Sequence, residues 1–429
     1  MISMNQASEF DYVLAGGGLQ SGLLALAIRH HSPNASVLLL EKGDHIAGNH
    51  TWSFHPGDVP ESCSSWIEPL IKYRWQRYEV RFSDFQRRIE LPYASIPSDH
   101  FASVVKDLFD EAAGDSYVGG NRGEVFSTRA AYGSGEVGLL TKSARMTSTW
   151  QLKTGVEVDE IHAGRVHTRC GQTFHGRLVI DCRGPSSQAD TFSGTGFQKF
   201  YGFEIESEDA WPRACPTLME SSADQRDGFR FLYTLPFTRN RVLIEDTRFS
   251  DTPRLNRLEC LSQVEDYLHR NGVSRYRIVR EESGVLPMPF SSELLPHAGR
   301  PLAGGYAGGW FHAATGYSFP MAVGFADAVA SRSVYVSEPE VASLAEEHRW
   351  RSRYARFLNR LLFRLVAPER RFKIFKRFYR VLGERSIERF YSHRFTFADA
   401  FRIVVGVPPT LSGLRPHRFL RSFFRGDES

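Results

Sequence analysis

The sequence predicts an α/β fold: a Rossmann-like dinucleotide-binding domain, a β-sheet domain and a helical C-terminal region. Three observations predict it. A glycine-rich turn near the start lies between a short apolar run and a stretch with helical spacing. Short strand-like runs bounded by turn residues follow in the middle of the chain. Beyond residue 338, apolar residues recur with helical periodicity. Together these patterns are typical of layered α/β domains rather than of an all-helical or all-β chain.

The first predicted unit is a strand at Tyr12–Ala15, a helix at Leu19–His31 and a second strand at Val37–Leu40. A strand, a tight turn, a helix and a parallel strand within about 30 residues form one βαβ unit.

The turn of this unit has the composition of a phosphate-binding loop. Gly16 and Gly18 stand in the first two places of the G-x-G-x-x-G pattern, Ser21 replaces the third glycine, and Gly22 follows. Glycines let the backbone approach a pyrophosphate, which the helix N-terminus then binds. Glu41, after the second strand, is placed to accept hydrogen bonds from a ribose. We therefore predict Gly16, Gly18, Gly22 and Glu41 as dinucleotide-binding residues.

Composition narrows the class of protein. The 429 residues suffice for two or three domains. Five scattered cysteines without a CxxC pair favour a reducing compartment and give no zinc spacing, and we predict no metal site. The start of the chain has no signal-peptide pattern, and no apolar run reaches the roughly 18 residues of a spanning helix.

Further elements are predicted along the chain. Leu178–Ile180 is a strand that leads into Asp181, and Phe229–Leu235 pairs with Val242–Phe249 as a hairpin. Phe319–Ser331 has helical spacing. A segment rich in Gly, Ser, Thr and Arg is predicted as a mobile surface loop at 114–148.

These elements predict the following domains. The dinucleotide-binding domain is discontinuous, over 1–100, 150–195 and 280–335. A substrate-binding β-sheet domain spans 196–279 with contributions from 50–100. A basic helical region spans 336–429.

Two later segments resemble flavoproteins of the aromatic-hydroxylase and carotenoid-cyclase superfamily, whose fold is of the glutathione-reductase type. Val179–Gly184 (VIDCRG) is similar to their V-I-D-x-R-G stretch, and Leu302–Ala330 to their late glycine strand and helix. The resemblance implies FAD as cofactor, with Asp181, Gly305 and Gly316 near it. The G-D dipeptide common in hydroxylases is absent, since Gly304-Gly305-Tyr306 occupies its neighbourhood.

Three motifs resemble the bacterial lycopene β-cyclase family more closely. They are Gly48–Phe54 (GNHTWSF), Leu243–Thr247 (LIEDT) and Phe311–Ser318 (FHAATGYS). The likeness runs from about Asp11 to about Pro409, except for Ser116–Ser148, which we interpret as an insertion.

The resemblance implies a reaction and its cofactors. Lycopene would be converted through γ-carotene to β-carotene with reduced FAD, NAD(P)H as reductant and no net redox change, which makes the protein an isomerase. An acid protonates C2, the C5=C6 bond closes the ring, and C6 loses a proton. Two alternatives remain open: a flavin-dependent monooxygenase or reductase acting on an isoprenoid, and a carotenoid-binding protein without turnover.

Three acids are catalytic candidates. Glu204 resembles a glutamate required in the bacterial family, and Glu245 and Asp246 lie in the LIEDT motif. On a strand, Glu245 shares a face with Leu243, while Asp246 faces the other side with Arg248 as an ion-pair partner. We therefore expect Glu245 to face the hydrocarbon, since burial raises a carboxyl pKa and favours a proton donor.

Aromatic side chains are candidates for stabilising the cation. We predict this role for Trp52 and Tyr317, which lie in two of the family motifs, and for Phe249 on the face of Glu245.

The C-terminal region is strongly basic, with 20 Lys and Arg against four acids from Arg349 to Arg425. Its helices would either lie on anionic lipid, with Phe and Leu toward the bilayer, or pack their apolar face on the body. The expected location is the cytoplasm, peripheral at the inner face of the cell membrane. Expected partners are lycopene, membrane lipid and other carotenoid-pathway enzymes; no nucleic-acid-binding module is recognisable.

Overall fold

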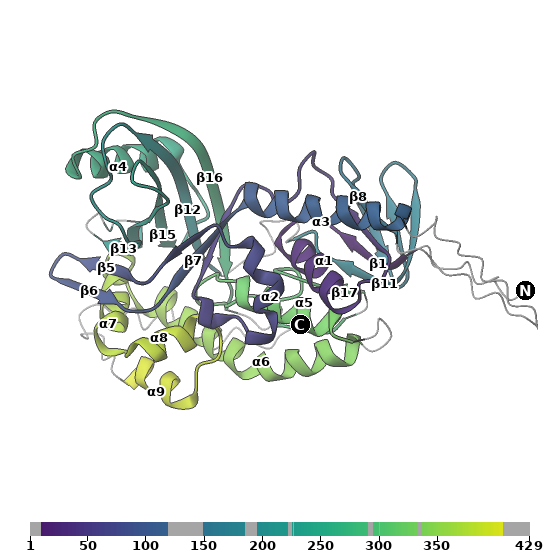
Figure 1. Ribbon diagram of the computed structural model, residues 1–429. Helices are drawn as coiled ribbons and strands as arrows, with labels where there is room; N and C mark the ends of the chain where they lie inside the picture. The colour runs from purple at the N-terminus through teal and green to yellow at the C-terminus, as the bar shows by residue number, and fades with distance from the viewer. Residues whose placement is uncertain are drawn as a thin grey trace, which may run out of the picture.

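A computed structural model describes residues 10–118, 149–184, 195–221, 225, 227–290, 295–299, 301–332 and 337–405. Figure 1 shows the sheet of β1 and β11 with helices α1 and α3 on one side, a large, mainly antiparallel sheet with helix α4 on the other, and C-terminal helices below both. The α/β fold with a helical C-terminal region is as predicted.

The first sheet has the strand order β8-β2-β1-β11-β10-β9, and β17 pairs with β11. Strands β1, β2, β8, β11 and β17 are parallel, as expected for a βαβ-based sheet. The bounds are β1 Phe10–Ala15, β2 Val37–Leu40, β8 Trp150–Lys153, β9 Val158–His162, β10 Arg165–Thr168, β11 Thr173–Asp181 and β17 Leu302–Ala303.

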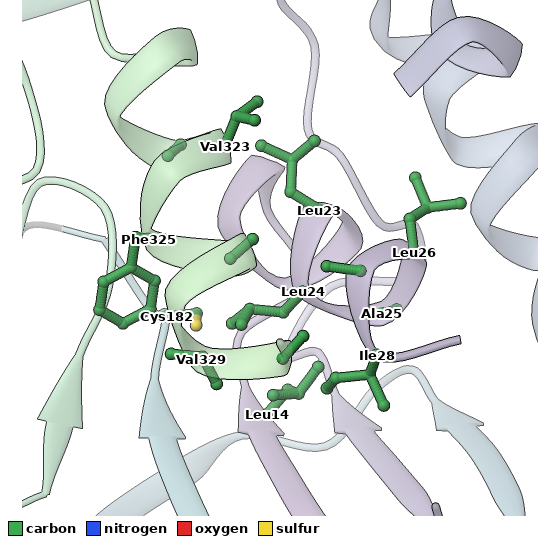
Figure 2. Packing of buried hydrophobic residues seen from close by; sticks show 14 of the residues in the cluster. Leu14, Leu23, Leu24, Ala25, Leu26, Ile28, Cys182, Val323, Phe325 and Val329 are labelled. Atoms are coloured by element: carbon green, nitrogen blue, oxygen red, sulfur yellow. The ribbon is translucent and has the colours of Figure 1, made fainter. Parts of the chain in front are cut away.

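Helices α1 (Leu19–His31), α3 (Ser98–Val118) and α5 (Phe319–Ala330) pack around this sheet. Figure 2 shows Leu23 and Leu24 of α1 beside Val323 and Val329 of α5, above Leu14 of β1. These apolar side chains are buried in one core, and burial of such side chains is the main favourable contribution to folding. The predicted limits of the first helix and second strand are confirmed.

The second sheet has the order β16-β12-β15-β14-β13-β5-β6. Its central strands are antiparallel, and the predicted hairpin of β14 with β15 is confirmed. The bounds are β5 Tyr78–Phe82, β6 Phe85–Ile89, β12 Gly196–Ser207, β13 Thr217–Ser221, β14 Phe229–Pro236, β15 Arg241–Ser250 and β16 Tyr276–Met288.

Different elements pack on the two faces of the second sheet. Helix α4 (Arg257–Arg270) packs on one face, against Phe203, Leu232 and Ile244. The other face meets the C-terminal helices and the small sheet β3-β7-β4. The bounds are α2 Ser64–Ile67, β3 Thr51–Phe54, β4 Tyr73–Trp75, β7 Tyr93–Pro97, α6 Ser337–Arg360, α7 Phe372–Val381, α8 Glu384–Tyr391 and α9 Phe397–Val405.

Buried arginines tie the C-terminal helices to the body. Arg371 is fully buried, pairs with Asp251 at 2.5 Å and donates to the Phe249 carbonyl. Arg356 is also buried, whereas Phe357 is 40% exposed. The expected segregation, with arginines outward and apolar residues on one face, therefore does not hold along α6.

Two predicted limits differ from the structure. Strand β16 continues to Met288, past the expected boundary at 279, because it pairs with β12 along its length. Residues 114–118, the start of the predicted loop, continue helix α3. Residues 119–148 lie outside the described part of the chain.

Candidate active site

Two glutamates and a glycine form one cross-strand row on the face opposite α4. Gly202 of β12 pairs with Glu245 of β15 on one side and with Glu282 of β16 on the other. A Cβ atom at Gly202 would lie 2.9 Å from Glu245 Cγ and 3.0 Å from Glu282 Cγ. Both side chains therefore occupy the space above the glycine. Any larger residue at position 202 would fill that space.

Glu245 is a half-buried carboxyl group on this face of the sheet. Burial and the negative charge of Glu282 raise its pKa well above the ordinary value, with Arg280 opposing them. A carboxyl group in such surroundings keeps its proton to a higher pH than an exposed one and can act as an acid.

Glu282 is held on one side only. Its Oε2 accepts from Thr51 Oγ1 at 2.8 Å and from Arg280 Nη1. Its Oε1 is buried and has no conventional donor among the described residues, while its carboxyl group lies within hydrogen-bonding reach of that of Glu245. Thr51 belongs to the motif at 48–54, so this motif orients the second carboxyl group.

Glu204 lies on the same face, one pair further along the strands. It is buried between two arginines: Arg280 Nε donates to its Oε2 at 2.7 Å, and Arg241 Nε donates to its Oε1. Since Arg280 also contacts Glu282, the structure connects Glu204 to the row through this arginine.

Asp246 is not part of this site. It is fully buried on the face of α4, where Arg230 Nε donates to it at 2.8 Å and Arg248 Nη2 at 3.1 Å. The predicted alternation of Glu245 and Asp246 and the ion pair with Arg248 are confirmed. The candidate catalytic role of Asp246 is corrected, because a residue one position along a strand points to the opposite face.

Phenol side chains cluster near Glu245. Tyr233 is the β14 partner of Glu245, and its hydroxyl lies 3.1 Å from that of Tyr93. Tyr317 donates to Asp58 at 3.0 Å. Burial raises the pKa of Tyr233, Tyr93 and Tyr317 above the usual range, so these rings stay neutral. Neutral aromatic faces can stabilise a cation, which fits the prediction for Tyr317.

Two other predicted aromatics lie elsewhere. Trp52 contacts Phe101 of α3, with ring centroids 5.1 Å apart, and packs on the first core, because Thr51 takes the face toward Glu282. Phe249 shares the face of Glu245 but is buried against Phe229 and Phe375. Both are therefore corrected to packing residues.

The glycine loop is shaped for a pyrophosphate. Gly16 has φ +101°, and a Cβ there would lie 2.7 Å from the Cys182 carbonyl oxygen. Gly18 precedes the first turn of α1, and a Cβ there would meet nothing within 4 Å. Glu41 Oε2 accepts from the Gly17 amide. The open space at a helix N-terminus fits the phosphates of a dinucleotide.

The remaining predicted cofactor residues are dispersed. Gly305 (φ +58°) donates its amide to Gln20 of α1, and the Gly316 carbonyl accepts from Tyr306. The Asp181 carboxylate pairs with Arg183. A Cβ at Gly22 would lie 2.3 Å from Phe101, so Gly22 permits the close packing of α1 on α3 and does not face the loop.

Comparisons with known proteins show the family of the chain. A sequence profile described as "Lycopene cyclase protein" matches residues 11–131 and 140–415. The chain belongs to the lycopene cyclase family. It is 33% identical to a lycopene beta-cyclase of Pseudescherichia vulneris over 94% of this chain and 95% of that protein. It is 35% identical to one of Paracoccus sp. (strain N81106 / MBIC 01143) over 93% and 94%.

The family match also corrects one expectation. Only residues 132–139 are left out between its two segments, so most of the supposed insertion at Ser116–Ser148 is matched by the lycopene cyclase family. Among solved structures, the p-nitrophenol 4-monooxygenase PnpA from Pseudomonas putida is similar in fold, with a TM-score of 0.57 and 10% identity over 92% of this chain and 98% of that one.

Two kinds of feature are absent from the described part of the chain. No helix there is both long and apolar enough to cross a bilayer. No group of three or more His, Cys, Asp or Glu side chains is arranged to hold a metal ion there.

Sequence reasoning missed Glu282, Arg280 and Gly202. A signal existed, since a glycine inside a strand of bulky residues marks a close approach. It could not be used, because residues 280–288 were assigned to the other domain and pairing between distant strands is not visible in one sequence.

Proposed function

We propose that this protein is a lycopene β-cyclase, an isomerase that converts lycopene through γ-carotene to β-carotene. Family membership supports it. The observation that carries it is Glu245, a half-buried carboxyl group beside Glu282 and near neutral phenols, whose pKa is strongly raised. An acid without competing water is what protonation of an alkene requires.

The residues around Glu245 have separate tasks in the proposed reaction. Glu245 holds the proton that is transferred to C2 of lycopene. Tyr233 and Tyr317 present rings to the resulting cation. Glu204 orients Arg280, and so acts on the row of acids without touching the substrate.

The glycine loop and Glu41 would hold FAD, with Gly305 and Gly316 nearby. When bound and reduced, FAD would supply negative charge close to the cation. NAD(P)H is the proposed reductant. The residues around Glu245 give no specific support to the alternative of a monooxygenase or reductase. The raised pKa of Glu245 favours acid chemistry instead.

Helix α9 supports peripheral binding to lipid, proposed here at the inner face of the cell membrane. Phe397, Phe401 and Val405 recur every fourth residue and are 75%, 65% and 59% exposed. Arg402 lies in the same helix, with its side chain 60% exposed. Exposed aromatics beside a cation are typical of helices that lie in the interface of an anionic bilayer, where a hydrocarbon substrate would be found.

The test is the carotenoid profile of lycopene-accumulating cells that express the chain. Wild-type protein should yield γ-carotene and β-carotene, and Glu245→Gln should leave lycopene unchanged at equal protein level. An oxygenated or saturated product would overturn the proposal. Lycopene bound without turnover would favour the carotenoid-binding alternative.

A further inference from the structure

We propose that Glu245 and Glu282 act as one acid–base pair, in which Glu245 gives the proton to C2 and Glu282 takes the proton from C6. This inference rests on the proposed lycopene cyclisation and adds a second catalytic residue to it. It also gives a role to Gly202, Thr51 and Arg280, which the family motifs alone do not explain.

The position of Gly202 brings the two carboxyl groups together. Strands in a sheet lie about 4.8 Å apart, so residues on β15 and β16 are separated by the intervening β12. At Gly202 no side chain fills this gap, and both glutamate Cγ atoms lie within 3.0 Å of the position a Cβ would take. The two side chains therefore lean toward each other over β12.

The contacts of the two residues suit them to different roles. Arg280 and Thr51 both donate to Glu282 Oε2, so one oxygen of this carboxyl group is held in place. Glu245 makes no ion pair with any described residue, and burial together with the charge of Glu282 raises its pKa. Glu245 is accordingly the acid of the pair. Glu282 is the acceptor, because its Oε1 has no protein donor among the described residues apart from the neighbouring Glu245.

The reaction requires an acid and a base close together. C2 and C6 are both bonded to C1 once the ring closes, so they lie about 2.5 Å apart. The O–H bond of Glu245 breaks as C2–H forms, C1–C6 closes, and C6–H breaks as Glu282 Oε1 receives the proton. Transfer of that proton across the pair, with exchange against solvent protons between turnovers, restores the starting state with no net gain or loss of protons or electrons.

The negative charge of the glutamate pair is complementary to the positive charge of the substrate during the reaction. The pair bears two negative charges only while the substrate carries its positive charge. A pair of carboxylates beside a carbocation stabilises it more than a single one would. Arg280 offsets part of the repulsion, because it contacts Glu282 and lies near Glu245.

Other ionisable groups lie near the pair. Burial lowers the pKa of His50 and raises those of Tyr233 and Tyr93. Arg280 and its partner Glu204 form a buried ion pair. A pH dependence of activity is therefore assigned to the Glu245–Glu282 pair by comparing wild type with Glu282→Gln.

The experiment compares Glu282→Gln with Glu281→Gln in the full-length protein, with reduced FAD and lycopene in vesicles under anaerobic conditions. Glu281 is the matched control, because it lies one residue away on the opposite face and pairs with Arg257 and Tyr201. We expect Glu281→Gln to retain wild-type products. Glu282→Gln should lower kcat about 100-fold with little change in KM.

The product spectrum separates a base from a structural residue. Without the base, the cation at C5 should lose a proton from C4 or from its methyl group, so rings with the double bond elsewhere should replace part of the β-rings. Glu282→Asp should give an intermediate share. The pH profile of activity should also differ between wild type and Glu282→Gln, because the variant has lost one of the two coupled carboxyl groups.

Two outcomes overturn different claims. If Glu282→Gln, or Glu282→Asp where the former does not fold, keeps the wild-type products and pH profile, the pair is wrong while the proposed function stands. If wild-type protein makes no ring at all under these conditions, the proposed function itself is wrong.

Discussion

Glu245 and Asp246 are neighbours in the chain but face opposite sides of strand β15. Glu245 lies beside Glu282 on one face, whereas Asp246 is buried beside α4 on the other, between Arg230 and Arg248. We therefore expect the two adjacent acids of this motif to have different tasks, one in the chemistry and one in the structure.

This difference predicts the behaviour of Asp246→Asn. The substitution leaves Arg230 and Arg248 buried with less compensation, and loss of one partner of a buried ion pair costs about 3 kcal/mol or more. Denaturant unfolding should show that loss, while cyclisation per folded molecule stays within a few-fold of wild type. A folded, stable Asp246→Asn protein without activity would contradict this assignment.

Gly202→Ala tests the close approach of the two glutamates. The new methyl group would lie within 3.0 Å of both Cγ atoms and should push the carboxyl groups apart. Overpacking of this kind costs about 1–3 kcal/mol, and we expect activity to fall at least about tenfold. Stopped anaerobic assays on purified protein measure this; wild-type rates would show that the row has no catalytic importance.

The raised pKa of Glu245 predicts a pH-dependent stability difference. Because the folded pKa is higher than the unfolded one, folding binds a proton, and stability is lost as pH rises from the unfolded toward the folded pKa. Glu245→Gln removes this loss. The variant should have the higher Tm at pH 8, and the difference should vanish near pH 4. A constant difference across that range would argue against a raised pKa.

Gly18→Ala tests the proposed FAD site without straining the backbone. Gly18 has φ −83°, and the added Cβ would project into open space before helix α1. FAD affinity should fall about tenfold or more in a fluorescence titration, with the Tm of the cofactor-free protein unchanged. Gly324→Ala in α5, where a Cβ makes only an ordinary contact with Leu344, is the control and should bind FAD normally.

The exposed face of α9 predicts lipid binding. Phe397→Ser combined with Phe401→Ser removes two rings, worth roughly 3 kcal/mol of bilayer burial together, or about 100-fold in partitioning. Flotation with anionic vesicles measures this. Leu258→Ser, at a 71% exposed position on α4, is the control. Equal flotation of both variants would remove α9 as the contact surface.

The sequence predicted those parts of the molecule that depend on local patterns. The strand, glycine turn and helix at Tyr12–His31 follow from apolar spacing, and the opposite orientations of Glu245 and Asp246 follow from strand alternation. Trp52 was misplaced because the same alternation, applied to β3, directs Thr51 toward the acids. Glu282 was missed because its importance depends on register across β12, which distant contacts determine.

The most direct test of the account is cyclisation of lycopene in D₂O by the purified protein with reduced FAD, without oxygen. Acid-initiated closure predicts one deuterium at C2 for each β-ring formed, with FAD still reduced at the end. Ring formation without deuterium, a strict requirement for oxygen or an oxygenated product would contradict it.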